Sequence, residues 1–373
     1  MQPTMFDPAV LEKYTYPTPF LLIDPDAIMD KYRSFTTLLP RVQLHYAMKC
    51  NPDTRILTLL HNAGSQFEIA SLAELESLLA IGVEPTSVLF TNPVKMWQHI
   101  QGAYQAGVRR FSFDSNMELE KIATYAPGAE VFVRLKTVAA ASGVPSEGKF
   151  GVDTTQAAAL MRQARSLGLG TYGISFHVGS QMTDPQAWEQ AIAASAELMK
   201  ILDKDHIRIK LLDMGGGFPA QYTEALPPLS AFASCINQAL SSHLPYEVQL
   251  AIEPGRALVA EAGVMVATVI GLASRGKKDW LHIDVGAFNG LMEALESQNQ
   301  LRFPVSDSKQ SPRKALYHLT GPSCDSQDTI LYDVALSAGL KAGDRVYIHT
   351  SGAYTTAYAS TFNGFAVPTV YFI

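Results

Sequence analysis

Cysteine is scarce in this 373-residue chain, and the three cysteines lie far apart in the sequence. Cys50, Cys235 and Cys324 form neither a metal-type pair nor the dense spacing of a disulfide framework. The first residues carry no basic segment followed by an apolar core, so we predict no secretory signal. We therefore expect no metal site, reduced thiols and a cytoplasmic location.

Long apolar runs and an excess of positive charge are also missing. The longest apolar run, residues 263–273, is much shorter than the roughly 20 residues that span a membrane, and we interpret it as a long strand. The formal net charge is -6, so the chain lacks the basic surface that binds nucleic acid. We expect neither a membrane nor a nucleic acid as a partner.

What the sequence does contain is an alternation of short apolar runs with helical patterns. The predicted strands cover residues 42–48, 65–70, 87–91, 110–114, 130–135, 172–178, 208–214 and 247–252. Between two of them, Ser71 and Glu74 form a capping-box signature before a leucine-rich helical pattern. Strands separated by helices pair in parallel through right-handed crossovers. Eight such units favour an α/β fold with a (β/α)8 TIM-like barrel, and a doubly wound sheet is the alternative.

The pattern changes after about residue 262, where helical segments between strands become rare. The predicted strands of this part cover residues 264–273, 280–286, 315–321, 344–350 and 368–373. Such a series predicts a C-terminal antiparallel β domain. We divide the chain into a barrel at residues 24–262 and a β-rich domain formed by residues 1–23 and 263–373.

Unusual polar residues end or follow the predicted barrel strands. They are Lys49, Glu68, Arg134, His177, Gly215 to Gly217, Glu253 and Arg256. Each alone has a structural explanation, since a lysine can mark the end of a buried strand and a glycine triplet can form a turn. The carboxyl ends of barrel strands meet on one rim. Together, these residues predict an active site there.

The residue types suit a planar, phosphorylated cofactor that accepts electrons. The run 213-DMGGGFP-219 lets backbone N–H groups approach a phosphate, and Arg256 adds a charged anchor. We expect Lys49 to be desolvated, which lowers its pKa and lets the neutral amine form a Schiff base. Glu253 can hold a ring nitrogen protonated, and His177 can stack on the ring. The predicted cofactor is pyridoxal 5′-phosphate.

Six short motifs carry these residues. They are 45-HYAMKCN-51, 176-FHVGSQ-181, 213-DMGGGFP-219, 253-EPGR-256, 321-GPSCDSQD-328 and 353-AYTTAYASTFNGF-365. In this order, and over nearly the whole chain, they resemble the ornithine/diaminopimelate/arginine decarboxylase family, the barrel-type pyridoxal-phosphate enzymes.

The resemblance implies a role for each matching residue of the barrel. Lys49 would carry the cofactor, His177 would stack on its ring, and Glu253 would pair with the ring nitrogen. Arg134 would lie near the ring hydroxyl and Glu68 near the lysine. The residues expected at the phosphate are Ser180, Gly215, Gly216, Gly217, Arg256 and Tyr354.

The resemblance also implies a homodimer with two shared sites. Cys324 would return a proton to the α-carbon after carbon dioxide leaves, and Asp325 would meet the distal end of the substrate. Both belong to the partner subunit's site in this family. Lys149 and Asp328 match a pair that the family forms across the interface.

Substrate choice depends on the distal acids. Asp325 favours a distal ammonium group, which predicts decarboxylation of a basic amino acid, first of all L-ornithine to putrescine for polyamine biosynthesis. Tyr354 and Glu296 are the other expected substrate contacts. Glu293 and Glu296 are glutamates where ornithine decarboxylases have an aspartate, so lysine, both substrates or arginine remain alternatives.

Three further alternatives are a diaminopimelate decarboxylase, a barrel-type amino-acid racemase and an inactive regulatory homologue. The first typically has glutamate at the position of Asp325, and the second lacks the 321-GPSCD-325 signature. Inactive homologues usually lose the lysine or the cysteine, and this chain keeps both Lys49 and Cys324.

Overall fold

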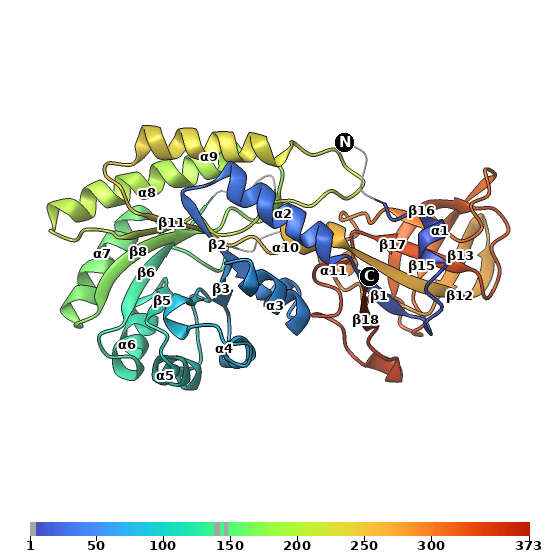
Figure 1. Cartoon of the computed structure of the whole chain (residues 1–373), viewed down its shortest axis with the longest axis horizontal. Helices are drawn as coiled ribbons and strands as arrows, with labels where there is room; N and C mark the ends of the chain where they lie inside the picture. The colour runs from blue at the N-terminus through green and yellow to red at the C-terminus, as the bar shows by residue number, and fades with distance from the viewer. Residues whose placement is uncertain (1–4, 138–141, 145–147) are drawn as a thin grey trace. The chain divides into compact units, whose positions relative to one another are not determined.

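Eight parallel strands close into a barrel, as the alternation in the sequence predicted. The computed structural model describes residues 5–137, 142–144 and 148–373 (Figure 1). In barrel order the strands are β2 (Val42–Ala47), β3 (Gln66–Ile69), β4 (Leu89–Phe90), β5 (Arg110–Phe113), β6 (Glu130–Leu135), β8 (Gly170–Phe176), β10 (Leu211–Asp213) and β11 (Gln249–Ile252). The doubly wound alternative is therefore wrong.

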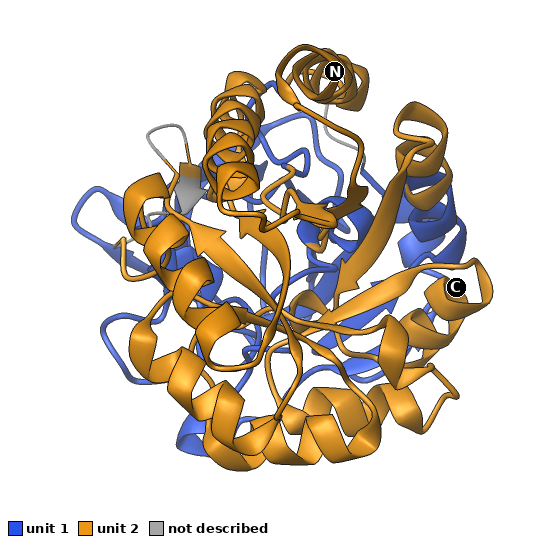
Figure 2. Cartoon of the chain, turned by 90° about the vertical axis from the view of Figure 1, so that its left-hand side faces the viewer, with its two compact units in different colours: residues 1–31, 219–226, 256–373 blue, residues 32–218, 227–255 orange. Residues whose placement is uncertain are grey.

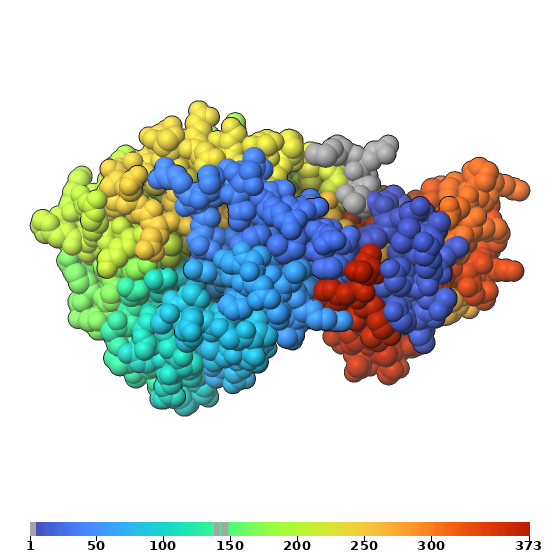
Figure 3. Space-filling view, in the orientation of Figure 1, coloured from blue at the N-terminus to red at the C-terminus, as the bar shows by residue number. Residues whose placement is uncertain are grey.

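Helices alternate with these strands and surround them (Figure 2). They are α3 (Thr54–Asn62), α4 (Leu72–Leu79), α5 (Trp97–Ala106), α6 (Asn116–Tyr125), α7 (Thr154–Ser166), α8 (Gln186–Lys204) and α9 (Leu229–His243), and α2 (Pro25–Leu38) precedes β2. In the space-filling view, side chains of the light-blue to green part of the chain form a continuous surface (Figure 3). Within the described residues, no helix is long and apolar enough to cross a membrane.

Side-chain caps decide where several of these helices begin. Ser71 accepts a hydrogen bond from the Glu74 N–H, and the Glu74 carboxylate accepts one from the Ala70 N–H, which confirms the predicted cap. Asp53 and Ser115 cap α3 and α6 in a similar way. An N-cap satisfies donors that the first turn leaves open, so each strand end passes into its helix through a short, fixed turn. Those turns form the upper rim of the barrel.

The barrel interior is filled by apolar side chains. Leu89, Phe132, Tyr172, Leu211 and Ala251 form one buried cluster and come from different strands. A TIM barrel is a packed core of this kind, so its strands hold fixed positions.

The chain divides into two compact units (Figure 2). The barrel unit comprises residues 32–218 and 227–255, and the β unit comprises residues 1–31, 219–226 and 256–373. The division that we predicted differs from this one at residues 24–31, 219–226 and 256–262, which pack with the β unit.

The β unit is built on a largely antiparallel sheet. Its strands are β1 (Phe20–Ile23), β12 (Gly263–Arg275), β13 (Lys278–Ile283), β14 (Val305–Asp307), β15 (Lys314–Thr320), β16 (Thr329–Ser337), β17 (Arg345–His349) and β18 (Thr369–Phe372). The path runs β14-β17-β12-β13-β15-β16, with β1 paired to β12 and β18. Two pairs, β13 with β15 and β1 with β18, are parallel. The predicted β domain is confirmed, with these two exceptions to its antiparallel pattern.

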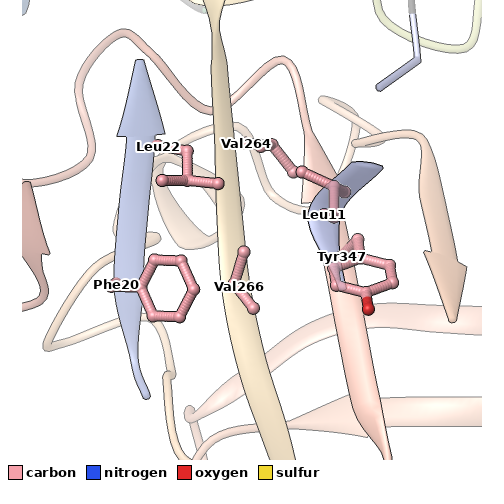
Figure 4. Close-up of a cluster of buried hydrophobic side chains, with 6 residues drawn as sticks. All are labelled: Leu11, Phe20, Leu22, Val264, Val266 and Tyr347. Carbon is pink, nitrogen blue, oxygen red and sulfur yellow. The ribbon is translucent and has the colours of Figure 1, made fainter. Parts of the chain in front are cut away.

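Short helices and an apolar cluster complete the β unit. The helices are α1 (Pro8–Leu11), α10 (Arg256–Val259) and α11 (Glu293–Glu296). Six fully buried side chains pack together along one face of β1, β12 and β17 (Figure 4): Leu11, Phe20, Leu22, Val264, Val266 and Tyr347. In the barrel unit, β7 (Ser142–Val144) and β9 (Ser180–Met182) pair antiparallel in a separate two-stranded sheet.

A buried ion cluster joins the loop before α5 to α6 in the barrel unit. The Lys95 Nζ atom lies 2.8 Å from Glu118 Oε1 and donates to the carbonyl oxygens of Asn92 (3.0 Å) and Ser112 (2.6 Å). Lys121 Nζ lies 2.6 Å from Glu118 Oε2. Burial lowers the pKa of Lys95 to about 8, and the Glu118 carboxylate opposes that fall. Glu118 therefore offsets part of the free-energy cost of burying the charged Lys95 side chain.

Replacing Glu118 with alanine is expected to destabilise the barrel unit by about 3–5 kcal/mol, because it leaves a buried ammonium without its counter-charge. The loss should shrink as the pH rises towards about 8, because without Glu118 the pKa of Lys95 falls below that value and the variant then buries a neutral amine. Urea unfolding at several pH values measures both effects. Glu120→Ala, an exposed site on the same helix, is the control and should change stability by no more than about 0.5 kcal/mol. Equal effects of the two variants would contradict this role.

Candidate active site

The structure places the candidate residues of the barrel unit at the carboxyl ends of its strands. Lys49 follows β2 in the turn Met48–Cys50, and Glu68 and Arg134 lie near the ends of β3 and β6. His177 directly follows β8, and Glu253 directly follows β11. The glycine run at residues 215–217 follows β10. Since the strands are parallel, these groups share one rim.

Lys49 is held by an acid on the neighbouring strand. Its Nζ atom donates to Glu68 Oε1 at 2.6 Å, and the Thr91 hydroxyl donates to Glu68 Oε2 at 2.5 Å. Glu68 is almost fully buried, whereas the Lys49 side chain is 42% exposed. Our expectation of a desolvated lysine is therefore wrong for this chain. The reason is local. Strand β2 ends at Ala47, and the following turn buries the side chains of Met48 and Cys50 but leaves that of Lys49 partly exposed.

A second buried acid stands beside Glu253. Glu253 is 8% exposed and Asp213, the last residue of β10, is 1% exposed. Burial raises the pKa of both carboxyl groups, and the charge of Asp213 raises that of Glu253 further. The Glu253 Oε1 atom is buried, and no N–H or O–H donor among the described residues reaches it. A buried acceptor of this kind requires a partner.

His177 presents a neutral ring. Its Nδ1 accepts a hydrogen bond from the Gly179 N–H at 3.0 Å, so Nδ1 carries no proton. Burial, together with the charges of Arg134 and Lys49, lowers the pKa of His177 to about 3. Burial also lowers the pKa of Arg134, whose guanidinium lies 5.2 Å from the Phe150 ring centre. A neutral imidazole can stack on a flat aromatic ring without adding charge.

The glycine run is required by close approaches of the backbone. Gly215 and Gly217 have φ angles of +62° and +98°, and a Cβ at Gly216 would lie 2.5 Å from the Glu253 carbonyl oxygen. The Gly215 N–H donates to Asp213 Oδ1 at 3.0 Å. Among the described residues, the N–H groups of Gly216 and Gly217 donate no hydrogen bond. Two open backbone donors in a tight loop suit an anionic group.

These features fit pyridoxal 5′-phosphate. Lys49 would bind the cofactor, the unpartnered Glu253 Oε1 would accept from its protonated ring nitrogen, and the Gly216 and Gly217 N–H groups would meet its phosphate. Ser180, at the start of β9, is the other candidate phosphate contact of the barrel unit. Within the described residues, no cluster of three or more His, Cys, Asp or Glu side chains suits a metal ion.

In the β unit, Arg256 forms an ion pair with Glu293, which the sequence analysis named as a candidate substrate contact. Its guanidinium bonds both oxygens of Glu293, with Nη1 2.6 Å from Oε2, and Nη1 also donates to the Tyr222 hydroxyl at 2.9 Å. Both side chains of the ion pair are 4% exposed. The Tyr354 ring centre lies 4.8 Å from the guanidinium. Of the two glutamates of α11, only Glu296 is exposed.

The loop at residues 321–328 is anchored by its own last residue. Asp328 is buried and accepts hydrogen bonds from the N–H groups of Ala287 (2.8 Å) and Ser323 (3.0 Å). Cys324 is exposed, and the Asn363 side-chain amide donates to its Sγ at 3.3 Å. Asp325 Oδ1 accepts from the Gln327 N–H at 2.8 Å.

Lys149 is exposed, as an interface residue should be in a single chain. The Asp328 carboxylate, its expected partner across the interface, is already bonded within its own chain. Their pairing between subunits stays a prediction.

Sequence reasoning missed the roles of Asp213 and Thr91, and it considered Glu293 for the substrate and not for Arg256. Asp213 stands inside a quoted motif without an assigned role, Thr91 supports Glu68, and Glu293 binds Arg256. For Asp213 the signal was present, because it is the last strand residue before the glycine run. The partners of the other two lie 23 and 37 residues away, so no local pattern marks them.

Comparison with known proteins identifies the family. A model of the pyridoxal-binding domain of pyridoxal-dependent decarboxylases matches residues 25–260. The chain therefore belongs to the pyridoxal-dependent decarboxylases. More specifically, it is a pyridoxal-phosphate-dependent amino-acid decarboxylase of the group that includes the lysine, ornithine and arginine enzymes.

The relatives cover nearly the whole chain. The lysine/ornithine decarboxylase of Selenomonas ruminantium is 36% identical over 95% of this chain and 90% of its own length. Antizyme inhibitor 2 of Xenopus laevis is 32% identical over 95% of this chain and 80% of its own length.

Solved structures show the same fold. The crystal structure of SrLDC with PLP and cadaverine has a TM-score of 0.91 and 33% identity, and it covers 100% of this chain and 95% of that one. The arginine decarboxylase of Paramecium bursaria Chlorella virus has a TM-score of 0.91 and 30% identity, with 98% of each chain covered.

Replacing Lys49 with alanine should abolish covalent attachment of the cofactor, because no other amine is bonded to Glu68 among the described residues. In the wild-type protein, borohydride reduction should fix the cofactor on the peptide that contains Lys49, as mass spectrometry can show. The variant should lose both this label and the visible absorbance band. Lys136→Ala, which removes an exposed lysine, should keep both. A band that survives dialysis of the Lys49 variant would identify another lysine as the anchor.

Proposed function

We propose that this enzyme decarboxylates a basic amino acid with a terminal amine, first of all L-ornithine to putrescine in polyamine biosynthesis in the cytoplasm. One observation carries the reaction type: Lys49, bonded to Glu68, and the unpartnered acceptor of Glu253 stand at the ends of parallel barrel strands. Such a set provides an amine for the cofactor and an acid for its ring nitrogen.

The residues of the barrel unit prepare the cofactor. Glu68 accepts from the Lys49 ammonium at 2.6 Å, so it can take the proton that the amine must lose before it acts as a nucleophile. Pyridoxal phosphate, when bound, accepts the electron pair that carbon dioxide leaves behind. Glu253 holds the proton at the ring nitrogen that makes this possible, and His177 covers the ring face as a neutral group.

The β unit supplies the proton donor and the distal acids. Cys324 is exposed, and its S–H gives a proton to the α-carbon after carbon dioxide leaves. Asp325 and Glu296 form no ion pair among the described residues, so they can meet the distal ammonium group of the substrate. Arg256 and Tyr354 remain proposed phosphate contacts.

Lysine is the second candidate substrate. The relative at 36% identity is named a lysine/ornithine decarboxylase, and this chain has the longer acid Glu296 where an aspartate is expected for ornithine. We also propose a homodimer in which the loop at residues 321–328 of each chain serves the partner's site, as in the family that the sequence resembles.

The test is incubation of the protein with pyridoxal phosphate and ornithine, lysine, arginine or diaminopimelate, with carbon dioxide and amine measured. We expect the highest kcat/KM for ornithine, followed by lysine, and no reaction with diaminopimelate, whose distal end carries a carboxylate that Asp325 would repel. Cofactor binding without carbon dioxide release from any substrate would show an inactive regulatory homologue. Loss of optical activity without carbon dioxide would show a racemase.

Replacing Cys324 with alanine should slow protonation of the α-carbon and divert part of the product towards an aldehyde, because no thiol then returns the proton at that carbon. Product analysis by chromatography, together with carbon dioxide release, measures the ratio of aldehyde to amine. Cys235→Ala is the matched control, since that partly buried thiol donates to the Pro185 carbonyl oxygen at 3.3 Å in the barrel unit. An unchanged rate and product for Cys324→Ala would remove the thiol from the mechanism.

A further inference from the structure

Asp213 is a buried acid to which the reaction described so far gives no role. It ends β10, and Glu253 directly follows β11. The two strands pair in parallel, with Asp213 opposite Ala251, and the Glu253 N–H donates to the Gly215 carbonyl oxygen at 2.8 Å. Adjacent strands therefore deliver both carboxyl groups to the same point of the rim.

Both carboxyl groups are buried, and burial together with the charge of Asp213 raises the pKa of Glu253. Two buried acids side by side cannot both ionise at low cost. The pair therefore keeps a proton at neutral pH, and we assign it to Glu253, because Asp213 has the donor described next.

The Asp213 carboxylate is fixed by the Gly215 N–H, which donates to Oδ1 at 3.0 Å. An aspartate that bonds the N–H two residues later often does no more than shape a turn. That structural role needs only an acceptor oxygen, which asparagine also has. The turn therefore does not require the negative charge of Asp213.

Other charges face the pair from several elements. Glu68 of β3 raises the pKa of both acids, whereas Lys49 of the turn after β2 lowers that of Glu253 and Arg134 of β6 lowers that of Asp213. These charges have opposite signs. Asp213 stands beside Glu253 on the neighbouring strand, and among these charges its effect on the pKa of Glu253 is the largest.

We propose that Asp213 is a positioning residue whose charge makes Glu253 a stronger base towards the ring nitrogen of pyridoxal phosphate, so that the bound ring stays protonated. One proton passes from the Glu253 carboxyl to the ring nitrogen, and Asp213 keeps its charge throughout. This inference rests on the proposed cofactor chemistry, because a protonated ring is what accepts the electron pair.

The test uses pyridoxal phosphate labelled with 15N at the ring nitrogen, bound to the full chain without substrate. The 15N chemical shift reports whether the nitrogen is protonated. In the wild-type protein we expect a protonated nitrogen across about pH 6–8. In Asp213→Asn, which keeps the acceptor for the Gly215 N–H, the midpoint of deprotonation should fall by about one pH unit or more.

Asp307→Asn is the matched control. Asp307 is buried in the β unit and accepts hydrogen bonds from the N–H groups of Lys309, Gln310 and Ser337. Its replacement removes a buried charge bonded to backbone donors and should leave the 15N shift unchanged. Asp213→Ser, whose hydroxyl can also accept from the Gly215 N–H, replaces Asp213→Asn if that variant does not fold.

The outcomes separate this inference from the proposed function. If the variant at Asp213 binds the cofactor with the wild-type shift and midpoint, Asp213 only shapes the turn, and the decarboxylase proposal stands. If the wild-type protein binds no cofactor, both proposals are overturned. A lowered midpoint in the Asp213 variant alone supports the role of its charge.

Discussion

The parallel pairing of the barrel strands is the constraint on which the site depends. Because all eight strands run in one direction, residues from β2, β3, β6, β8, β10 and β11 end on one rim although more than 200 positions separate Lys49 from Glu253 in the sequence. The packed interior keeps those ends in place, and the capped helices return the chain through short turns. The backbone geometry of the barrel therefore determines which residues meet at the rim.

Charge at this rim is concentrated and mostly buried. Glu68, Asp213 and Glu253 bring three acids together, and Lys49 and Arg134 bring the opposing charges. Burial opposes ionisation of every one of these acids, so the balance between them decides which carries a proton. The Lys49 side chain donates a hydrogen bond to Glu68, whereas the charge of Asp213 raises the pKa of Glu253. Similar residue types thus acquire different chemical roles from their neighbours alone.

The β unit uses buried charge differently, to fix its loops. Arg256 and Glu293 form an ion pair with two hydrogen bonds and the hydroxyl of Tyr222 as a further partner. Asp328 holds the backbone of residues 287 and 323, so the loop that presents Cys324 and Asp325 is tied to a second segment of the same unit. Breaking either arrangement would leave a buried charge uncompensated, which is costly. The exposed groups of the loop are therefore carried on a rigid support.

The sequence by itself determined the elements and their ends. Strand patterns, the capping box at Ser71 and the order of the polar residues are local signals, and they predicted the barrel, the β domain and the rim. Only the tertiary structure decided which charges meet. Glu293 reaches Arg256 across 37 residues, and Asp213 lies beside Glu253 because β10 pairs with β11. The Lys49 side chain stays partly exposed and bonds Glu68 of the neighbouring strand. Backbone propensity acts over a few residues, whereas hydrogen bonds and pKa values depend on groups that the chain brings together only by folding.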